Sequence, residues 1–223
     1  MRIPSTLLSL AVILSMAVPS LAAGKAVDVH ALAQAVDSRY NHLRTLEAEF
    51  TEIYRGAGMD REESGTLWLK KPGKMCWQYR VPTEKLYVSD GKYAWFYVPA
   101  ERQVRKTPLR QLEDLQSPLA FLLGRTKLEK ELAGLSLAPD VKPLTPGDVV
   151  LRGVPKALAG RVNQVMLEIT PDDLIARILL EDADGSETEF RFRAQKENVE
   201  VSDERFRFTP PPGVEVVSGE EGQ

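Results

Sequence analysis

Residues 65–79 are Gly-Thr-Leu-Trp-Leu-Lys-Lys-Pro-Gly-Lys-Met-Cys-Trp-Gln-Tyr. Two runs of strand-forming residues, 65–70 and 74–80, flank a Pro72-Gly73 turn signal, and this arrangement predicts an antiparallel hairpin. Side chains alternate between the two faces of a strand. On the face that we expect to be the inner one, the hairpin carries Leu67, Leu69, Met75 and Trp77.

Further strands are predicted on both sides of this hairpin. Residues 46–51 alternate apolar and polar positions, and Asp90-Gly91 is a strong hairpin turn. Besides the first hairpin, strands are predicted at residues 46–51, 85–89, 93–98, 102–107, 162–170, 174–181 and 187–194. Consecutive antiparallel hairpins of this length should curl into one large sheet, so the predicted fold class is α+β and mainly β.

Two regions are predicted to be helical. Asp28 is a good N-cap for a first helix, whose apolar residues recur at helical spacing from Val29 to Tyr40. In the middle of the chain, residues 108–114 and 117–125 have helical character, and the second segment is apolar on nearly every side. Because so apolar a segment needs cover, we expect it to be a lid over an apolar cavity, formed by Leu119, Phe121, Leu122 and Leu123.

The N-terminus predicts export. Arg2, an apolar stretch of 12 residues from Leu7 to Val18 and a small-residue site ending at Ala22 indicate a cleavable signal peptide over residues 1–22. Residues 23–223 are then expected to form a single domain in the periplasm. The chain has one cysteine, Cys76, which excludes an internal disulfide and a cysteine-based zinc site and lies far from the cleavage site.

Signals for catalysis are scarce in the sequence. A net charge of −3 argues against general nucleic-acid binding, and the two histidines, His30 and His42, lack metal-binding spacing and are expected on the surface or in helix packing. We find no nucleophile elbow, phosphate loop or dinucleotide motif. Carboxylate pairs such as Glu62-Glu63 fall in predicted turns, which favours solvated loop ends. We therefore predict no enzyme, catalytic residue, metal site or cofactor, with a two-carboxylate hydrolase as the competing class.

Large apolar side chains are concentrated between residues 67 and 97, a stretch that includes all three tryptophans. A curled sheet this rich in them either packs a helix on its inner side or keeps a hollow for an apolar ligand. Alternation nominates as acyl-chain cavity residues Phe50, Leu67, Leu69, Met75, Trp77, Leu86, Val88, Trp95, Tyr97, Ile178, Leu180, Phe190 and Phe192. If Met75 and Trp77 point inward, Cys76 points outward and should be open to thiol reagents.

The chain resembles the periplasmic outer-membrane lipoprotein carrier proteins, the LolA family. The resemblance is carried by an ordered set of segments, namely residues 65–79, 88–99, 103–104, 117–124 and 206–214. It implies an incomplete β-barrel closed on one side by helices. It also implies a cofactor-free carrier, expected to be a monomer, that holds acyl chains in its cavity. Such a carrier takes acylated lipoproteins from an inner-membrane ABC transporter and passes them to an outer-membrane acceptor.

The sequence departs from the family pattern at several positions. Lys71 occupies the place of the basic residue that, by the resemblance, holds the lid, and lysine lacks the bidentate geometry of arginine. Met75-Cys76 stands where the family often has phenylalanine and arginine, and Glu52 replaces a common glutamine.

One further alternative stays open beside the carrier and the hydrolase. It is a periplasmic module of the same fold that senses mislocalised lipoproteins. A membrane-anchored acceptor is disfavoured because no cysteine stands at the cleavage site. The role of a basic run is also open: it either docks an acidic partner or is a solvated strand edge. The run consists of Arg102, Arg105, Lys106 and Arg110.

Overall fold

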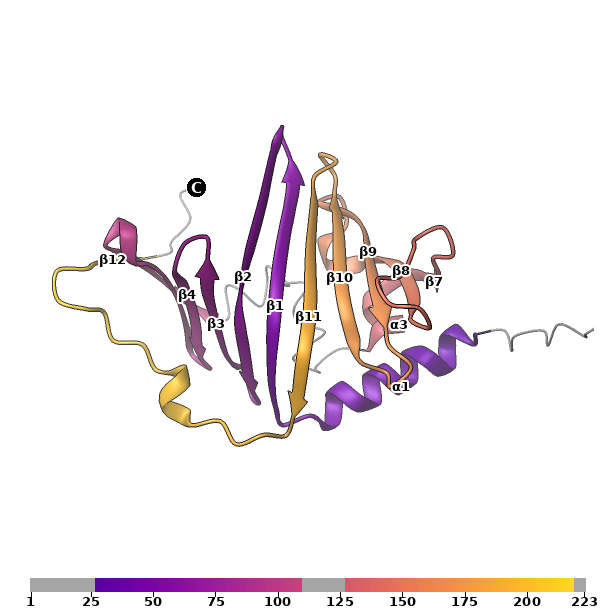
Figure 1. Ribbon diagram of the computed structural model, residues 1–223, viewed down its shortest axis with the longest axis horizontal. Helices are drawn as coiled ribbons and strands as arrows, with labels where there is room; N and C mark the ends of the chain where they lie inside the picture. Colours follow the sequence, from indigo (N-terminus) through magenta and orange to yellow (C-terminus); the bar gives the residue numbers. More distant parts are fainter. Residues whose placement is uncertain (1–26, 110–126, 219–223) are drawn as a thin grey trace, which may run out of the picture.

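The computed structural model describes residues 27–109 and 127–218, and within them twelve strands form one sheet (Figure 1). The strands are β1 Thr45–Gly56, β2 Met59–Lys70, β3 Lys74–Val81, β4 Lys85–Asp90, β5 Tyr93–Val98, β6 Gln103–Pro108, β7 Leu132–Leu137, β8 Val149–Pro155, β9 Val162–Ile169, β10 Ile175–Asp182, β11 Glu187–Glu197 and β12 Glu215–Ser218. Their order across the sheet is β12-β6-β5-β4-β3-β2-β1-β11-β10-β9-β8-β7. The predicted large, curled, mainly antiparallel sheet is confirmed.

Two meanders make up this sheet. β1 to β6 and β7 to β11 each run in sequence order, and the antiparallel pair of β1 with β11 joins them. The parallel pair of β12 with β6 adds the last strand at one edge. In the strand order β7 and β12 stand at opposite ends, so the sheet is open rather than a closed barrel.

β1 and β2 form a hairpin that extends well beyond the strands predicted at residues 46–51 and 65–70. β1 and β2 pair from Thr45 with Lys70 to Gly56 with Met59, around a turn in which Ala57 and Gly58 both have positive φ. Such a two-residue turn matches the twist of the strands. The extension consists mostly of polar residues, which hid its strand character. β7 was also missed, because its Gly-Leu-Ser sequence gives little periodicity.

Helix α1, Val29–His42, is confirmed with its predicted cap. The Asp28 side chain accepts hydrogen bonds from the backbone N–H of His30 and Ala31, at 3.0 and 3.2 Å. The helix buries Ala33, Val36 and Tyr40 against the sheet. It passes the ends of β10 and β9 toward the short helix α3, Leu128–Glu131 (Figure 1). We define the inner face of the sheet as the face that α1 covers.

The outer face has covers of its own. The segment of residues 198–208, here the C-terminal strap, leaves β11 and crosses β1 to β4 before the chain reaches β12 (Figure 1). It contains the short 3-10 helix η4, Asp203–Phe206. Two further 3-10 turns are η1, Pro99–Glu101, and η3, Lys156–Leu158. On the other meander, residues 138–148 cover a small outer cluster of Ala138, Val141, Val150, Met166 and Leu179.

The strap corrects the prediction for Cys76. The thiol does point to the outer face, opposite to Trp77, as alternation requires. However, the side chain of Phe206 lies over it, and Cys76 is only 3% exposed. Burial raises the pKa of the Cys76 thiol to about 11. The expected openness was wrong because the outer face is covered, and the inward orientation of Met75 and Trp77 stands.

The signal peptide and the residues 119–123 expected to form a lid lie outside the described residues, so both remain predictions. In the two described ranges, no helix combines the length and the apolar character that crossing a membrane requires.

Candidate functional site

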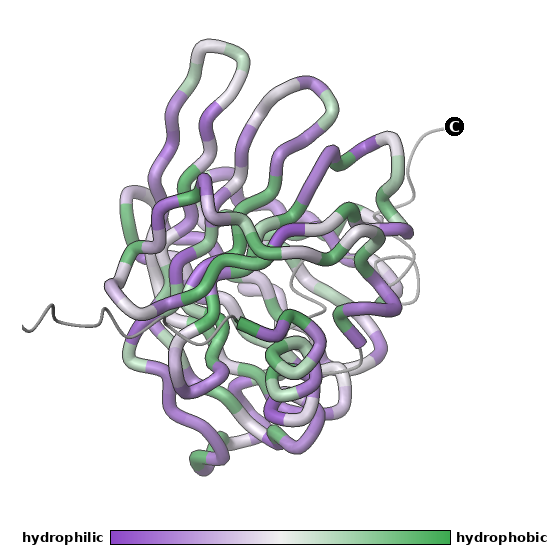
Figure 2. Tube along the Cα trace, turned by 90° about the vertical axis from the view of Figure 1, so that its right-hand side faces the viewer, coloured by the Kyte–Doolittle hydropathy of each residue, from purple (hydrophilic) through white to green (hydrophobic). Residues whose placement is uncertain are grey.

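The inner face of the sheet carries one buried apolar cluster. Neighbouring strands pair Leu67 with Trp77, Phe50 with Phe192, and Ile178 with Phe190, so these side chains share a face. The cluster contains nine of the predicted cavity residues, namely Phe50, Leu67, Leu69, Met75, Trp77, Ile178, Leu180, Phe190 and Phe192. Segments more than 100 positions apart in the sequence thus meet on one surface, below the polar hairpins that project from the sheet (Figure 2).

Four predicted cavity residues lie on the outer face instead: Leu86, Val88, Trp95 and Tyr97. The register of β3 with β4 pairs Trp77 with Tyr87, which places Tyr87 inside and its two neighbours outside. The register of β4 with β5 then pairs Val88 with Trp95 and Leu86 with Tyr97. The inner-face prediction for these four side chains was therefore wrong.

The physical reason differs between the two strands. In β4 the outer face, with Leu86 and Val88, is more apolar than the inner face, with Lys85, Tyr87 and Ser89, whereas β5 is apolar on both faces. Phe208, at the end of the C-terminal strap, packs against Trp95 and Tyr97 with ring centroids 5.6 and 5.4 Å apart. Hydrophobicity alone does not distinguish two covered faces. Tyr79 and Tyr87 are among the inner residues that the prediction missed. Tyr79 follows Trp77 by two residues, so strict alternation would have found it.

Aromatic rings form the centre of the inner cluster. The Phe50 ring lies edge-on to Trp77 and Tyr79, at centroid distances of 4.7 and 4.8 Å. Trp77 in turn meets the rings of Phe190 and Phe192 at 5.8 and 6.3 Å. Such edge-to-face pairs favour a defined packing arrangement, while each ring offers a large apolar surface.

Toward the β1–β2 turn, the inner face becomes polar. We call Glu52, Glu63, Tyr79 and Lys85 the polar row. The Tyr79 hydroxyl donates a 2.7 Å hydrogen bond to Glu52, and Lys85 forms an ion pair with Glu63. Burial raises the pKa of Glu52, an effect that the Tyr79 hydrogen bond partly offsets. The expectation that Glu63 is a solvated loop end was wrong, since it is 4% exposed within the extended β2.

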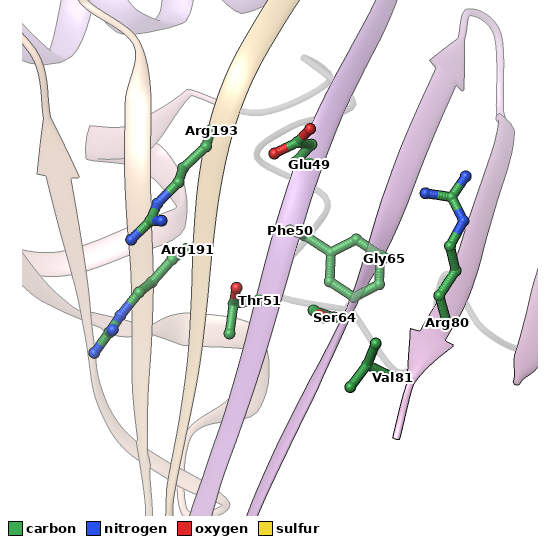
Figure 3. Close-up of a pocket in the computed structure, with 9 residues that line it drawn as sticks. All are labelled: Glu49, Phe50, Thr51, Ser64, Gly65, Arg80, Val81, Arg191 and Arg193. Carbon is green, nitrogen blue, oxygen red and sulfur yellow. The ribbon is translucent and has the colours of Figure 1, made fainter. Parts of the chain in front are cut away.

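Two hollows border this region. One, of about 570 Å³, lies at the rim of the inner face and includes Leu180 and Phe190 of the predicted set, next to Val162 and Leu158. The other, of about 350 Å³, lies mainly on the outer side of β1, β2 and β11 (Figure 3). Its lining is polar and includes Arg80, Arg191 and Arg193 with Glu49, so it does not suit an acyl chain.

Comparison with known proteins shows which family this chain is similar to. The family model described as "Outer membrane lipoprotein carrier protein LolA" matches residues 41–209. The chain belongs to the LolA family. It is 31% identical to an outer-membrane lipoprotein carrier protein of Chromobacterium violaceum, over 90% of this chain and 95% of that protein. It is 34% identical to the protein of the same name from Dechloromonas aromatica, over 83% of this chain and 88% of that protein.

A solved structure shows the same fold at low identity. It is an uncharacterized conserved protein from Thermus thermophilus, with a TM-score of 0.53 and 14% identity. The similarity covers 84% of this chain and 97% of that one. At this identity the match speaks for the fold alone.

In this member of the LolA family, Lys71 lies at the end of α1. Its Nζ donates hydrogen bonds to the carbonyl oxygen atoms of Tyr40 and Asn41, the latter at 3.2 Å. A cation at the C-terminus of a helix stabilises the exposed carbonyl groups there. The lid that Lys71 is expected to hold lies outside the described residues, so that role stays a prediction.

The remaining charged candidates have identifiable contacts. Lys106 of the basic run lies over the rings of Tyr93 and Trp95, at 4.0 and 4.7 Å, while Arg110 is outside the described residues. His30 contacts Glu129 and His42 contacts the Ser38 carbonyl oxygen, each at 2.7 Å, which agrees with surface and helix-packing roles. The described residues contain no group of three or more His, Cys, Asp or Glu side chains that would suit a metal ion.

Proposed function

We propose that this chain is a periplasmic carrier of acylated lipoproteins. It takes them as a monomer from an inner-membrane ABC transporter, holds their acyl chains on the inner face of the sheet, and delivers them to an outer-membrane acceptor. The observation that carries the proposal is the single apolar cluster that β1, β2, β3, β10 and β11 form on that face. Membership of the LolA family supports it.

The energetics favour such a surface. Each methylene group moved out of water contributes about 0.8 kcal/mol, so the acyl chains of one lipoprotein represent tens of kcal/mol when they are exposed. A packed core cannot admit them without cost. The inner cluster is rich in rings that meet edge-on, and acyl chains that separate such rings replace one set of apolar contacts with another.

The polar row gives the proposed site a direction. Chains that lie against Met75, Trp77 and Leu67 leave the polar end of the cargo near Glu52 and Glu63. There, charged and hydroxyl groups and solvent provide hydrogen bonds that the apolar cluster does not. The polypeptide part of the cargo is therefore expected to leave the carrier on the side of the β1–β2 turn.

The test is native mass spectrometry of the protein purified from the periplasm, with a co-purified acylated species as the expected result. A pair of variants makes the test specific for the inner face. Tyr87→Glu places a charge on the inner face and should abolish the co-purification. Tyr93→Glu, at an exposed position on the adjacent strand, should leave it intact. Co-purification that is absent from the wild type, or equal in both variants, would contradict the proposal.

A further inference from the structure

The indole N–H of Trp77 has no hydrogen-bond acceptor among the described residues. Trp77 is 2% exposed, and its Nε1 is buried without a partner. The contrast with Trp68 on the outer face is direct, since the Nε1 of Trp68 donates a 3.0 Å hydrogen bond to Glu47. Buried donors in folded proteins are nearly always satisfied, because an unmade hydrogen bond costs more than a made one gains. An orphan donor at the centre of a binding surface therefore points to an acceptor that arrives with a ligand.

The position of Trp77 defines which part of an amphiphile reaches it. Along β3 the inner-face residues run from Met75 through Trp77 to Tyr79, whose hydroxyl binds Glu52 of the polar row. Along β2 the same direction leads from Leu69 through Leu67 to Glu63. Trp77 thus stands between the apolar end of the inner face and the polar row. A molecule with apolar chains at one end and a polar group at the other places the linkage between them at this level.

We propose that the Nε1 of Trp77 donates a hydrogen bond to a carbonyl oxygen of the bound acyl group, an ester or an amide. The inference rests on the proposed carrier function and specifies the ligand chemistry of the same site. A carbonyl oxygen is an acceptor without a donor of its own, which is what an isolated N–H requires. Trp77 then distinguishes acylated cargo from molecules that offer only hydrocarbon or ether chains.

The surroundings of Trp77 explain why the described part of the chain gives it no acceptor. The rings around Trp77 belong to Phe50, Phe190 and Phe192, which carry no acceptor atoms beyond their faces. An N–H facing a ring gains only a weak interaction. Cargo that separates these rings gives the donor a strong acceptor, so the hydrogen bond is realised in the loaded state.

The experiment removes one N–H group without changing the shape of the side chain. Trp77 is replaced by benzothienylalanine, in which sulfur takes the place of the indole N–H. Two probes are titrated against an apolar fluorophore bound to the protein: 1,2-dipalmitoylglycerol, with ester carbonyls, and 1,2-dihexadecylglycerol, which has the same free hydroxyl group but ether linkages without carbonyls. The wild type should bind the ester roughly three- to tenfold more tightly, the size expected of one hydrogen bond. The Trp77 variant should bind both probes equally and retain the wild-type affinity for the ether.

The matched control is the same replacement at Trp68. There the lost N–H has an acceptor in the protein, so the melting temperature should fall while the ester preference persists. At Trp77 the melting temperature of the empty protein should hold or rise. An ester preference that survives in the Trp77 variant, or a wild type that binds both probes equally, overturns the inference and leaves the carrier function standing. A wild type that binds neither probe refutes the carrier function itself.

Discussion

Replacing Phe206 with alanine should make the Cys76 thiol accessible to reagents without displacing any inner-face residue. The Phe206 side chain is 1% exposed and fills the outer cluster between Trp68, Cys76 and Val88. Removal of a fully buried phenylalanine ring costs about 3–5 kcal/mol when the cavity remains open. Phe206 lies on a strap rather than on a strand, so the strap can respond by opening locally. A loss of about 3 kcal/mol would raise the open fraction roughly 100-fold.

Thiol labelling measures this opening directly. An anionic aromatic disulfide reagent should react with Cys76 of Phe206→Ala roughly 100 times faster than with the wild-type protein, in which the thiol is covered. The strap is also tied down by Asp203, which pairs with Lys70 and Lys74 at 2.8 and 3.1 Å. These contacts are exposed and should contribute little on their own.

Arg207→Ala provides the control, because Arg207 lies on the same strap but its side chain is 69% exposed and pairs with Glu204 on the surface. Its labelling rate should match the wild type. Equal, slow labelling of Phe206→Ala, with no loss in urea-measured stability, would refute the assignment of Phe206 as the cover. Fast labelling of the wild type would refute the burial of Cys76 itself.

Three further predictions concern ionisable groups. Burial raises the pKa of Glu52 in the folded protein above its usual 4.5, so the folded state binds the proton more tightly than the unfolded state does. The free energy of unfolding should therefore fall as the pH rises from 4.5 through the raised pKa. Glu52→Gln should flatten this decline in urea titrations from about pH 4 to 8, and an unchanged profile would contradict it. Lys71→Leu should lower stability by about 1 kcal/mol through loss of the α1 carbonyl contacts, and unchanged cargo transfer by this variant would assign Lys71 to the helix end alone. Arg177→Met should cost about 3–5 kcal/mol, because it removes the cationic partner of Glu168, whose side chain is 0% exposed. Adding Glu168→Gln should recover part of that loss in stability, and no recovery would count against the charge explanation.

Much of the fold follows from local pattern. The Pro72-Gly73 and Asp90-Gly91 turns and the strands around them lie where alternation and turn chemistry place them, and Asp28 caps α1 as expected. The extended part of the β1–β2 hairpin does not follow in this way. Residues 60–64 are polar because they lie beyond the apolar cluster, and their strand character comes from pairing with β1 rather than from burial of apolar side chains. Long-range pairing of this kind leaves little mark on a single sequence.

The candidate site was predictable where one face of a strand is polar. Phe50 and Phe192 are each flanked by polar residues, so alternation places them on the inner face correctly. In β4 and β5 the signal fails, because a segment more than 100 residues later in the chain supplies an apolar cover for the outer face. Which face of such a strand is the inner one depends on the register with Trp77, and only the assembled sheet provides that register.

The outer face has two buried apolar clusters, one under the C-terminal strap and one under residues 138–148. Together they suggest how a carrier can bind cargo on its inner face without unfolding. A guest on the inner face must separate rings that otherwise contribute to the core, and this would weaken a sheet that depended on one core only. Here the strap contacts β2 to β4 through Phe206. Residues 138–148 contact β8 to β10 through the cluster around Met166 and through the Lys142 carbonyl oxygen, which accepts a 3.1 Å hydrogen bond from Arg177. Glu168 also accepts a 2.7 Å hydrogen bond from the backbone N–H of Leu144, which ties that cover to the sheet. Since these covers pack on the face opposite to the inner cluster, the contacts that they make between strands would, under the proposed function, persist while an acyl chain enters the inner cluster.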